Sequence, residues 1–136
     1  MRTCILIATL LAFPIGVSAA AAEHTKDSLD TVKKNLAEKK AVIIDVREQS
    51  EWNQGHLEAA GLVPLSEMKL MASDPDMRKK LEKKLPKDRI IYCHCARGRR
   101  ALTAGEMLEK LGYDVRPLAA GFDELGKAGF PVSKQP

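Results

Sequence analysis

The stretch Arg89-Ile-Ile-Tyr-Cys-His-Cys-Ala-Arg-Gly-Arg-Arg100 joins a strand to a helix through a short loop that carries a cysteine. Residues 89–93 form the clearest strand pattern in the chain, because an apolar run follows a polar Lys-Asp turn. Beyond Gly98, apolar residues recur on one helical face at Ala101, Ala104, Leu108 and Leu111. Gly112 is well placed to end that helix. A strand, a tight loop and an amphipathic helix in this order indicate one βα unit of a parallel sheet.

Strands and helices alternate outward from this unit. Further strands are predicted at residues 41–45, 62–63 and 114–117, of which the first has the β-branched composition of a buried parallel strand. Helices are predicted at residues 28–40, 48–54 and 98–111, as two short helices within 65–85 interrupted at 73–76, and as a short helix ending near Gly129. This order predicts an α/β domain with a parallel sheet of about five strands and helices on both faces. Binding sites in such sheets lie beyond the carboxyl ends of the strands.

The N-terminal segment has the three-part pattern of a signal peptide. Arg2 supplies a positive charge, residues 4–17 form an apolar run, and residues 18–22 are all small. Cleavage after Ala20 or after Ala22 fits the small side chains equally well. A transmembrane anchor needs about 20 apolar residues, and this run is shorter. We therefore expect residues 1–22 to be removed and the mature protein to lie in the periplasm, free of the membrane.

The remaining residues, 23–136, fit a single domain. The chain has a net charge of +4, which falls to +3 when the segment containing Arg2 is removed. The basic residues are dispersed, and aromatic residues are few (three Phe, two Tyr and one Trp), so the sequence argues against nucleic-acid binding. Two cysteines remain, Cys93 and Cys95, and a disulfide between them would close almost no loop. Their role is expected to be chemical.

The loop that begins at Cys95 has the features of an anion site. Backbone N–H groups in a tight turn and in the first turn of a helix lack intrachain acceptors, and the helix dipole adds positive potential. A thiolate held there is stabilised relative to the thiol. Gly98 permits the sharp turn. We expect Cys95 to be the nucleophile and the rest of the loop to bind the substrate: Ala96, Arg97, Gly98, Arg99 and Arg100.

The loop pattern resembles the active-site loop of the rhodanese family. The matching segments are Cys95-x-x-Gly98-x-Arg100, Asp45-Val-Arg47, Glu51-Trp52-x-x-Gly55-His56-Leu57, Leu111 to Val115, and Gly121-Phe followed by Ala128 to Val132. Their order and spacing cover nearly all of the mature chain. Chain length and the signal peptide make it similar to the periplasmic phage-shock-protein E type of single-domain member.

The resemblance implies a thiosulfate sulfurtransferase. Cys95 would take the outer sulfur of thiosulfate as a persulfide and pass it to a thiol or to cyanide, which divides one transfer into two steps. Arg97 and Arg100 would bind the anionic donor and the leaving sulfite. The implied partners are a small anionic sulfur donor and a thiol acceptor, with no cofactor and no metal. Nothing in the sequence indicates an obligate interface, and a monomer is expected.

Three residues are expected to support the loop. Arg47 and Glu51 resemble a structural pair of the family that braces the neighbouring segment. Asp45 ends a predicted strand near the loop, and holding loop backbone is a better prediction for it than acid–base chemistry.

Several alternatives stay open at this point. If Cys93 were the nucleophile, Cys93-x5-Arg99 would match the longer loop of phosphatases and arsenate reductases, although the position of Gly98 favours Cys95. Cys93 could otherwise be a buried strand residue or a regulatory thiol that pairs with Cys95. A metal site is disfavoured because strand alternation points His94 away from both sulfurs. Finally, the protein could be a persulfide carrier or redox interaction protein that turns over poorly alone.

Overall fold

The computed structural model describes residues 21–134. The predicted signal peptide, residues 1–22, lies outside this range except for its last two residues, and it stays a prediction. Between residues 21 and 134, every helix falls short of the length and apolar character that a membrane span requires.

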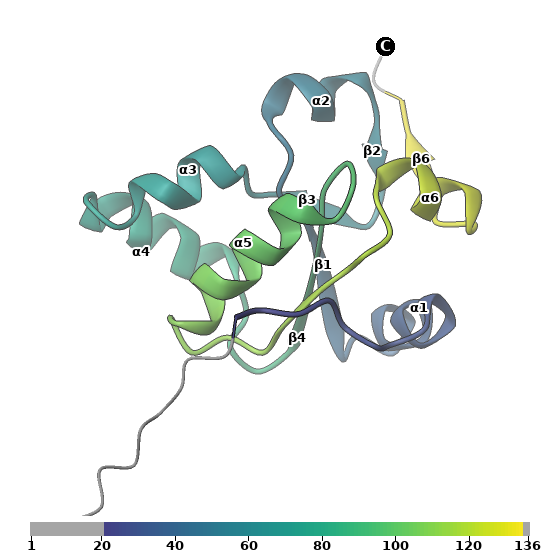
Figure 1. Ribbon diagram of the computed structural model, residues 1–136, viewed down its shortest axis with the longest axis horizontal. Helices are drawn as coiled ribbons and strands as arrows, with labels where there is room; N and C mark the ends of the chain where they lie inside the picture. Colours follow the sequence, from purple (N-terminus) through teal and green to yellow (C-terminus); the bar gives the residue numbers. More distant parts are fainter. Residues whose placement is uncertain (1–20, 135–136) are drawn as a thin grey trace, which may run out of the picture.

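Four parallel strands form the central sheet, in the order β3-β1-β4-β5. Their bounds are β1 Ala41–Asp45, β3 Ala60–Leu62, β4 Ile90–His94 and β5 Val115–Pro117. Two short strands, β2 (His56–Leu57) and β6 (Val132–Ser133), pair antiparallel in a separate sheet (Figure 1). The predicted α/β architecture with a parallel sheet is confirmed. Within the described residues this sheet has four strands rather than about five, because the remaining strand residues pair apart from it.

In the described part of the chain, six helices connect and cover the strands: α1 Leu29–Ala37, α2 Gln49–Gln54, α3 Leu65–Leu70, α4 Pro75–Lys84, α5 Arg99–Glu109 and α6 Phe122–Lys127. Side chains fix several of the starts. Ser28 precedes α1, and its hydroxyl accepts the Thr31 N–H in the first turn of that helix. Asp74 precedes α4, and its carboxylate accepts two N–H groups of the first turn. Pro75 then occupies the first helical position, where its missing N–H costs nothing.

The core divides into two clusters, one on each face of the sheet. Alternate strand residues face opposite ways, so Ile44 and Cys93 pack in one cluster while Ile43 and Tyr92 pack in the other. The first cluster lies under α3, α4 and α5, and the second lies under α1 and α6 (Figure 1). Helices on both faces, as predicted, hold the strand ends in fixed positions.

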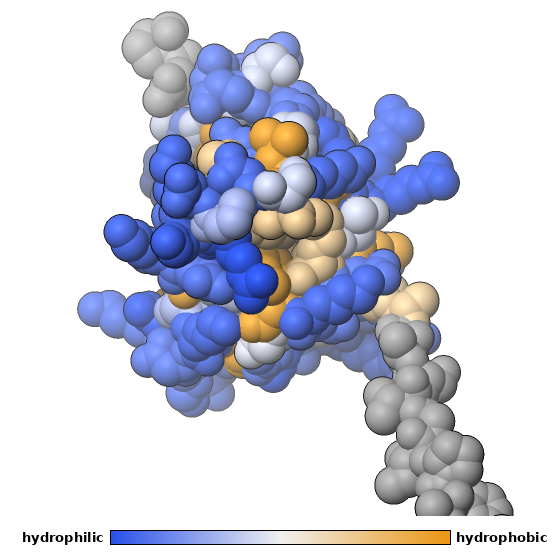
Figure 2. Space-filling model, turned by 90° about the vertical axis from the view of Figure 1, so that its left-hand side faces the viewer, coloured by the Kyte–Doolittle hydropathy of each residue, from blue (hydrophilic) through white to orange (hydrophobic). Residues whose placement is uncertain are grey.

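The first cluster reaches the surface where α3, α4 and α5 meet. Figure 2 shows this end of the molecule, where apolar side chains are visible between hydrophilic ones. A hollow of about 280 Å³ lies here, and its lining includes Met68, Met71, Met107 and Leu111.

Two close contacts shape the fold near the site. Trp52 is half-buried and stacks on the His56 ring at 3.7 Å between centroids. Helix α5 also approaches β5 so closely that a side chain at Gly105 would overlap the ring of Pro117. This close contact sets how near α5 lies to the sheet, and the cysteine loop joins the two.

Candidate active site

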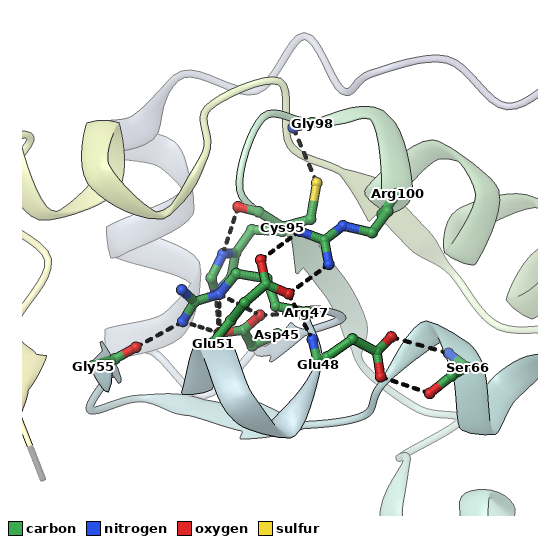
Figure 3. A network of polar contacts seen from close by, with 10 residues as sticks. Asp45, Arg47, Glu48, Glu51, Gly55, Ser66, Cys95, Gly98 and Arg100 are labelled. Atoms are coloured by element: carbon green, nitrogen blue, oxygen red, sulfur yellow. Dashed lines mark hydrogen bonds and ion pairs between the residues drawn. The ribbon is translucent and has the colours of Figure 1, made fainter. Parts of the chain in front are cut away.

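The cysteine loop lies at the carboxyl end of β4, between that strand and the start of α5 at Arg99. Cys95 is 2% exposed, and its Sγ accepts a hydrogen bond from the Gly98 N–H at 3.0 Å (Figure 3). Gly98 has φ +85, in the left-handed region that glycine occupies without strain. A Cβ at this position would also lie 2.8 Å from the Ala119 carbonyl oxygen. The predicted requirement for glycine is thus both conformational and steric.

A second glycine, Gly121, is needed for the same loop. A Cβ on Gly121 would overlap the Ala96 carbonyl and lie 2.5 Å from its carbon. The next residue, Phe122, donates its N–H to the Cys95 carbonyl at 2.9 Å. The segment before α6 therefore packs directly on the loop backbone. The sequence gives Gly121 only as part of a segment that resembles the family and does not place it in the site, because such contacts between distant segments leave no local pattern.

The N–H groups of the first turn of α5 have no intrahelical acceptors, and they lie at the positive end of the helix dipole. Arg97 and Arg99 are exposed, and no ion pair involves them among residues 21–134. Both are thus available to an anion that approaches the loop.

Arg100 forms an ion pair with Glu51 of α2. Its Nη1 and Nη2 donate to the two carboxylate oxygens of Glu51 at 2.6 and 2.7 Å, with both side chains about a third exposed. The hydrogen bond from Arg100 is the main reason that the pKa of Glu51 falls to about 2. Glu51 also accepts the Glu48 N–H and so caps α2. This pair fastens α2 to α5 beside the loop.

The expected pairing of Arg47 with Glu51 is wrong. Arg47 instead forms a buried ion pair with Asp45, with Nη2 to Oδ2 at 2.8 Å, and donates to the Gly55 carbonyl at 2.8 Å. Asp45 also accepts the Arg47 backbone N–H. The Arg47 guanidinium lies over the Phe122 ring, 4.1 Å from its centroid. Asp45 and Arg47 thus hold the backbone on either side of α2.

His94 lies next to the site. The sequence predicts only that its side chain points away from both sulfurs and gives it no role in the site. His94 is fully buried, its Nδ1 lies 3.4 Å from the Cys95 carbonyl oxygen, and its Nε2 has no hydrogen-bond partner among residues 21–134. Burial lowers its pKa, so the imidazole is neutral at ordinary pH. Its position behind the loop comes from strand alternation, which turns it away from the cysteine face.

Cys93 lies in the core and outside the loop. Its side chain is fully buried, and Sγ donates to the Ala101 carbonyl of α5 at 3.3 Å. Burial raises the pKa of the Cys93 thiol far above its usual range. A thiol in this state is a poor nucleophile, because the thiolate is the reactive form.

A hollow of about 280 Å³ lies beside the loop. It is lined by Arg47, Glu51, Gln54, Ala96, Phe122 and Asp123. In the part of the chain that the structure describes, no three His, Cys, Asp or Glu side chains gather as a metal site would require.

The fold and loop define a class of domain: an α/β unit whose cysteine directly follows a central strand and accepts a backbone N–H hydrogen bond at a helix start. Comparison of the sequence with known protein families narrows this class. The family model of the rhodanese-like domain matches residues 28–128, and the chain belongs to this family.

Solved structures with the same fold include the human single-domain sulfurtransferase TSTD1, with a TM-score of 0.62 and 26% identity over 79% of this chain and 96% of that one. A rhodanese-like domain protein from Staphylococcus aureus has a TM-score of 0.59 and 28% identity over 79% and 94% of the two chains. A Schizosaccharomyces pombe protein named "Putative thiosulfate sulfurtransferase, mitochondrial" is 34% identical over 85 residues, 60% of this chain. The chain spans 59% of that relative's length.

Proposed function

We propose that the protein is a sulfurtransferase that moves the outer sulfur of thiosulfate, or of a similar anionic donor, to a thiol or cyanide through a persulfide on Cys95. The observation that carries this proposal is the hydrogen bond from the Gly98 N–H to Cys95 Sγ at 3.0 Å. Backbone donors fixed at the reacting sulfur stabilise negative charge without reorganisation during the reaction. The family and its sulfurtransferase relatives support the same chemistry.

In the first step, the Cys95 thiolate attacks the outer sulfur of thiosulfate. A bond forms between Sγ and that sulfur, the sulfur–sulfur bond of thiosulfate breaks, and its electron pair leaves with sulfite. The product is an anionic persulfide on Cys95. The sequence favoured Arg97 and Arg100 for binding the dianionic donor and the leaving sulfite. Because Arg100 is paired with Glu51, we assign this role to Arg97 and Arg99, which are exposed at the mouth of the loop.

In the second step, an acceptor thiolate or cyanide attacks the outer sulfur of the persulfide. The bond to Sγ breaks, its electron pair returns to Cys95, and the acceptor leaves with the sulfur. The loop is suited to both steps because the charge on the sulfur remains negative throughout. The hollow lined by Glu51, Ala96 and Phe122 opens beside the loop and offers an approach for the acceptor.

The buried position of Cys93 supports Cys95 as the nucleophile over the longer phosphatase-like loop. Arg99, the arginine of that alternative pattern, is exposed, whereas the Cys93 thiol donates to Ala101 in the core. A persulfide carrier with slow turnover is the second candidate, since the 2% exposure of Cys95 would slow release of its sulfur to any acceptor that does not open the loop. Export to the periplasm after cleavage at Ala20 or Ala22 is part of the proposal and rests on the signal-peptide pattern.

The test is thiocyanate formation by the purified protein with thiosulfate and cyanide. Turnover that Cys95→Ser abolishes and Cys93→Ser retains would support the enzyme. Fast persulfide formation followed by slow release to cyanide, with rapid release to a protein thiol, would instead support the carrier. Hydrolysis of an aryl phosphate dependent on Cys93 would contradict both.

A further inference from the structure

The residues just before α1 contact the cysteine loop, although they precede the part of the chain that matches the family, which starts at residue 28. His24 is half-buried, and its Nε2 lies 2.9 Å from the Gly98 carbonyl oxygen. A carbonyl oxygen only accepts, so Nε2 carries the hydrogen and donates it. The same Gly98 carbonyl accepts the Leu102 N–H at a long 3.4 Å, which leaves it incompletely satisfied by the helix.

Two further contacts fix this segment to the sheet. The Thr25 N–H donates to the carbonyl of Pro117, the last residue of β5, at 2.7 Å. The Asp27 carboxylate accepts the Tyr92 hydroxyl at 2.6 Å and the Arg116 guanidinium at 2.8 Å. We call residues 24–27 the strap. It precedes α1 and is drawn at the purple end of the colour scale in Figure 1.

Gly98 is confined between two segments from opposite ends of the chain. A Cβ on Gly98 would lie 3.0 Å from His24 Nε2 and 2.8 Å from the Ala119 carbonyl oxygen. Gly98 is also the residue whose N–H contacts Cys95 Sγ. The N–H and the carbonyl of Gly98 belong to different peptide groups joined at its Cα, so holding the carbonyl restricts the φ and ψ rotations at Gly98 that would carry its N–H away from the sulfur.

We propose that one residue of the strap, His24, is a positioning residue of the active site that holds Gly98 so that its N–H faces Cys95. The proposal rests on the proposed function for its catalytic consequence, but not for the bracing itself. His24 touches neither donor nor acceptor and acts through Gly98. With cleavage at Ala22 it would be the second residue of the mature chain, so the segment freed by processing would complete the loop.

The test compares His24→Ala, His24→Gln and the control Lys26→Ala. Lys26 is exposed and forms no hydrogen bond or ion pair among residues 21–134. Backbone hydrogen exchange of the purified protein, without any sulfur donor, is measured for the peptide that covers residues 94–102. Loss of one hydrogen bond should speed loop exchange by roughly two- to tenfold in His24→Ala. His24→Gln should restore slow exchange because its amide can donate to the same carbonyl, and Lys26→Ala should match the wild type.

Thiocyanate formation is measured on the same proteins, and kcat/KM for thiosulfate should fall by a similar factor only in His24→Ala. Unchanged loop exchange in His24→Ala, a uniform rise across the whole chain, or no rescue by His24→Gln would overturn the role of the strap. If no variant and no wild-type protein forms thiocyanate, the sulfurtransferase proposal fails, while the exchange comparison still decides whether the strap braces the loop.

Discussion

Gly121→Ala offers a steric test of how the loop is held. Gly121 has φ −85 and ψ 178, an ordinary extended conformation, so alanine introduces no backbone strain of its own. Its Cβ would, however, lie 2.5 Å from the Ala96 carbonyl carbon and 3.1 Å from the Arg97 nitrogen. Carbon atoms in contact are separated by about 3.5 to 4.0 Å. The cysteine loop must therefore move by about 1 Å or more to accept one methyl group.

Such a shift has two expected consequences. Forcing a methyl group into close-packed backbone costs about 1–3 kcal/mol in the free energy of unfolding. Displacing reacting groups by about 1 Å costs about 100-fold in rate. We expect kcat/KM for thiosulfate to fall at least this far while the protein remains folded, because the movement falls on the loop and not on the sheet.

The assays are thiocyanate formation and urea unfolding, with Gly61→Ala as the matched control. A Cβ at Gly61 would meet nothing within 4 Å, so its stability and rate should stay close to the wild type. A Gly121→Ala protein that keeps the wild-type rate would refute the claim that the contact between this segment and the loop positions Cys95. A Gly61→Ala protein that loses as much would show that the effect is not specific to the loop.

Three further predictions concern the residues around the loop. Cys93→Ala should keep thiocyanate formation within about twofold and cost about 1 kcal/mol in urea unfolding, because Cys93 is a core residue; lost activity would contradict this. Asp45→Ala should cost about 3–5 kcal/mol, since it leaves Arg47 buried without its partner; a loss below about 1 kcal/mol would contradict it. The pKa of Glu51 is lowered from 4.5 to about 2, so its ion pair stabilises the fold fully above pH 4.5 and not below pH 2. Above pH 4.5, the wild type should exceed Glu51→Gln in unfolding free energy by up to about 1 kcal/mol, as expected for a partly exposed pair. This difference should fall to zero as the pH is lowered from 4.5 to about 2; a difference that does not change with pH would count against the pair.

The sequence predicted the features that local patterns determine. The apolar run of β4, the glycine of the loop and the apolar face of α5 each depend on residues that lie close together in the sequence. Together they predict the βα unit. The spacing to Gly98 favours Cys95 over Cys93 as the nucleophile, and in the structure Cys95 Sγ accepts the Gly98 N–H. Local spacing sufficed here because the loop is short.

The partners of charged side chains were not predictable in the same way. Arg47 pairs with Asp45 and Glu51 pairs with Arg100, because β1 and α2 place these groups at angles that the sequence does not specify. The contact between His24 and Gly98 was not predicted either, since nothing in the neighbours of His24 indicates it. Such contacts depend on how segments pack after the sheet has formed.

The central claim is that Cys95 carries a persulfide. The most direct measurement is the intact mass of the reduced protein after incubation with thiosulfate, compared with Cys95→Ser and Cys93→Ser. The wild type and Cys93→Ser should each gain one sulfur atom that cyanide removes, and Cys95→Ser should gain none. A gain that depends on Cys93, or no gain in any of the three proteins, would contradict the account.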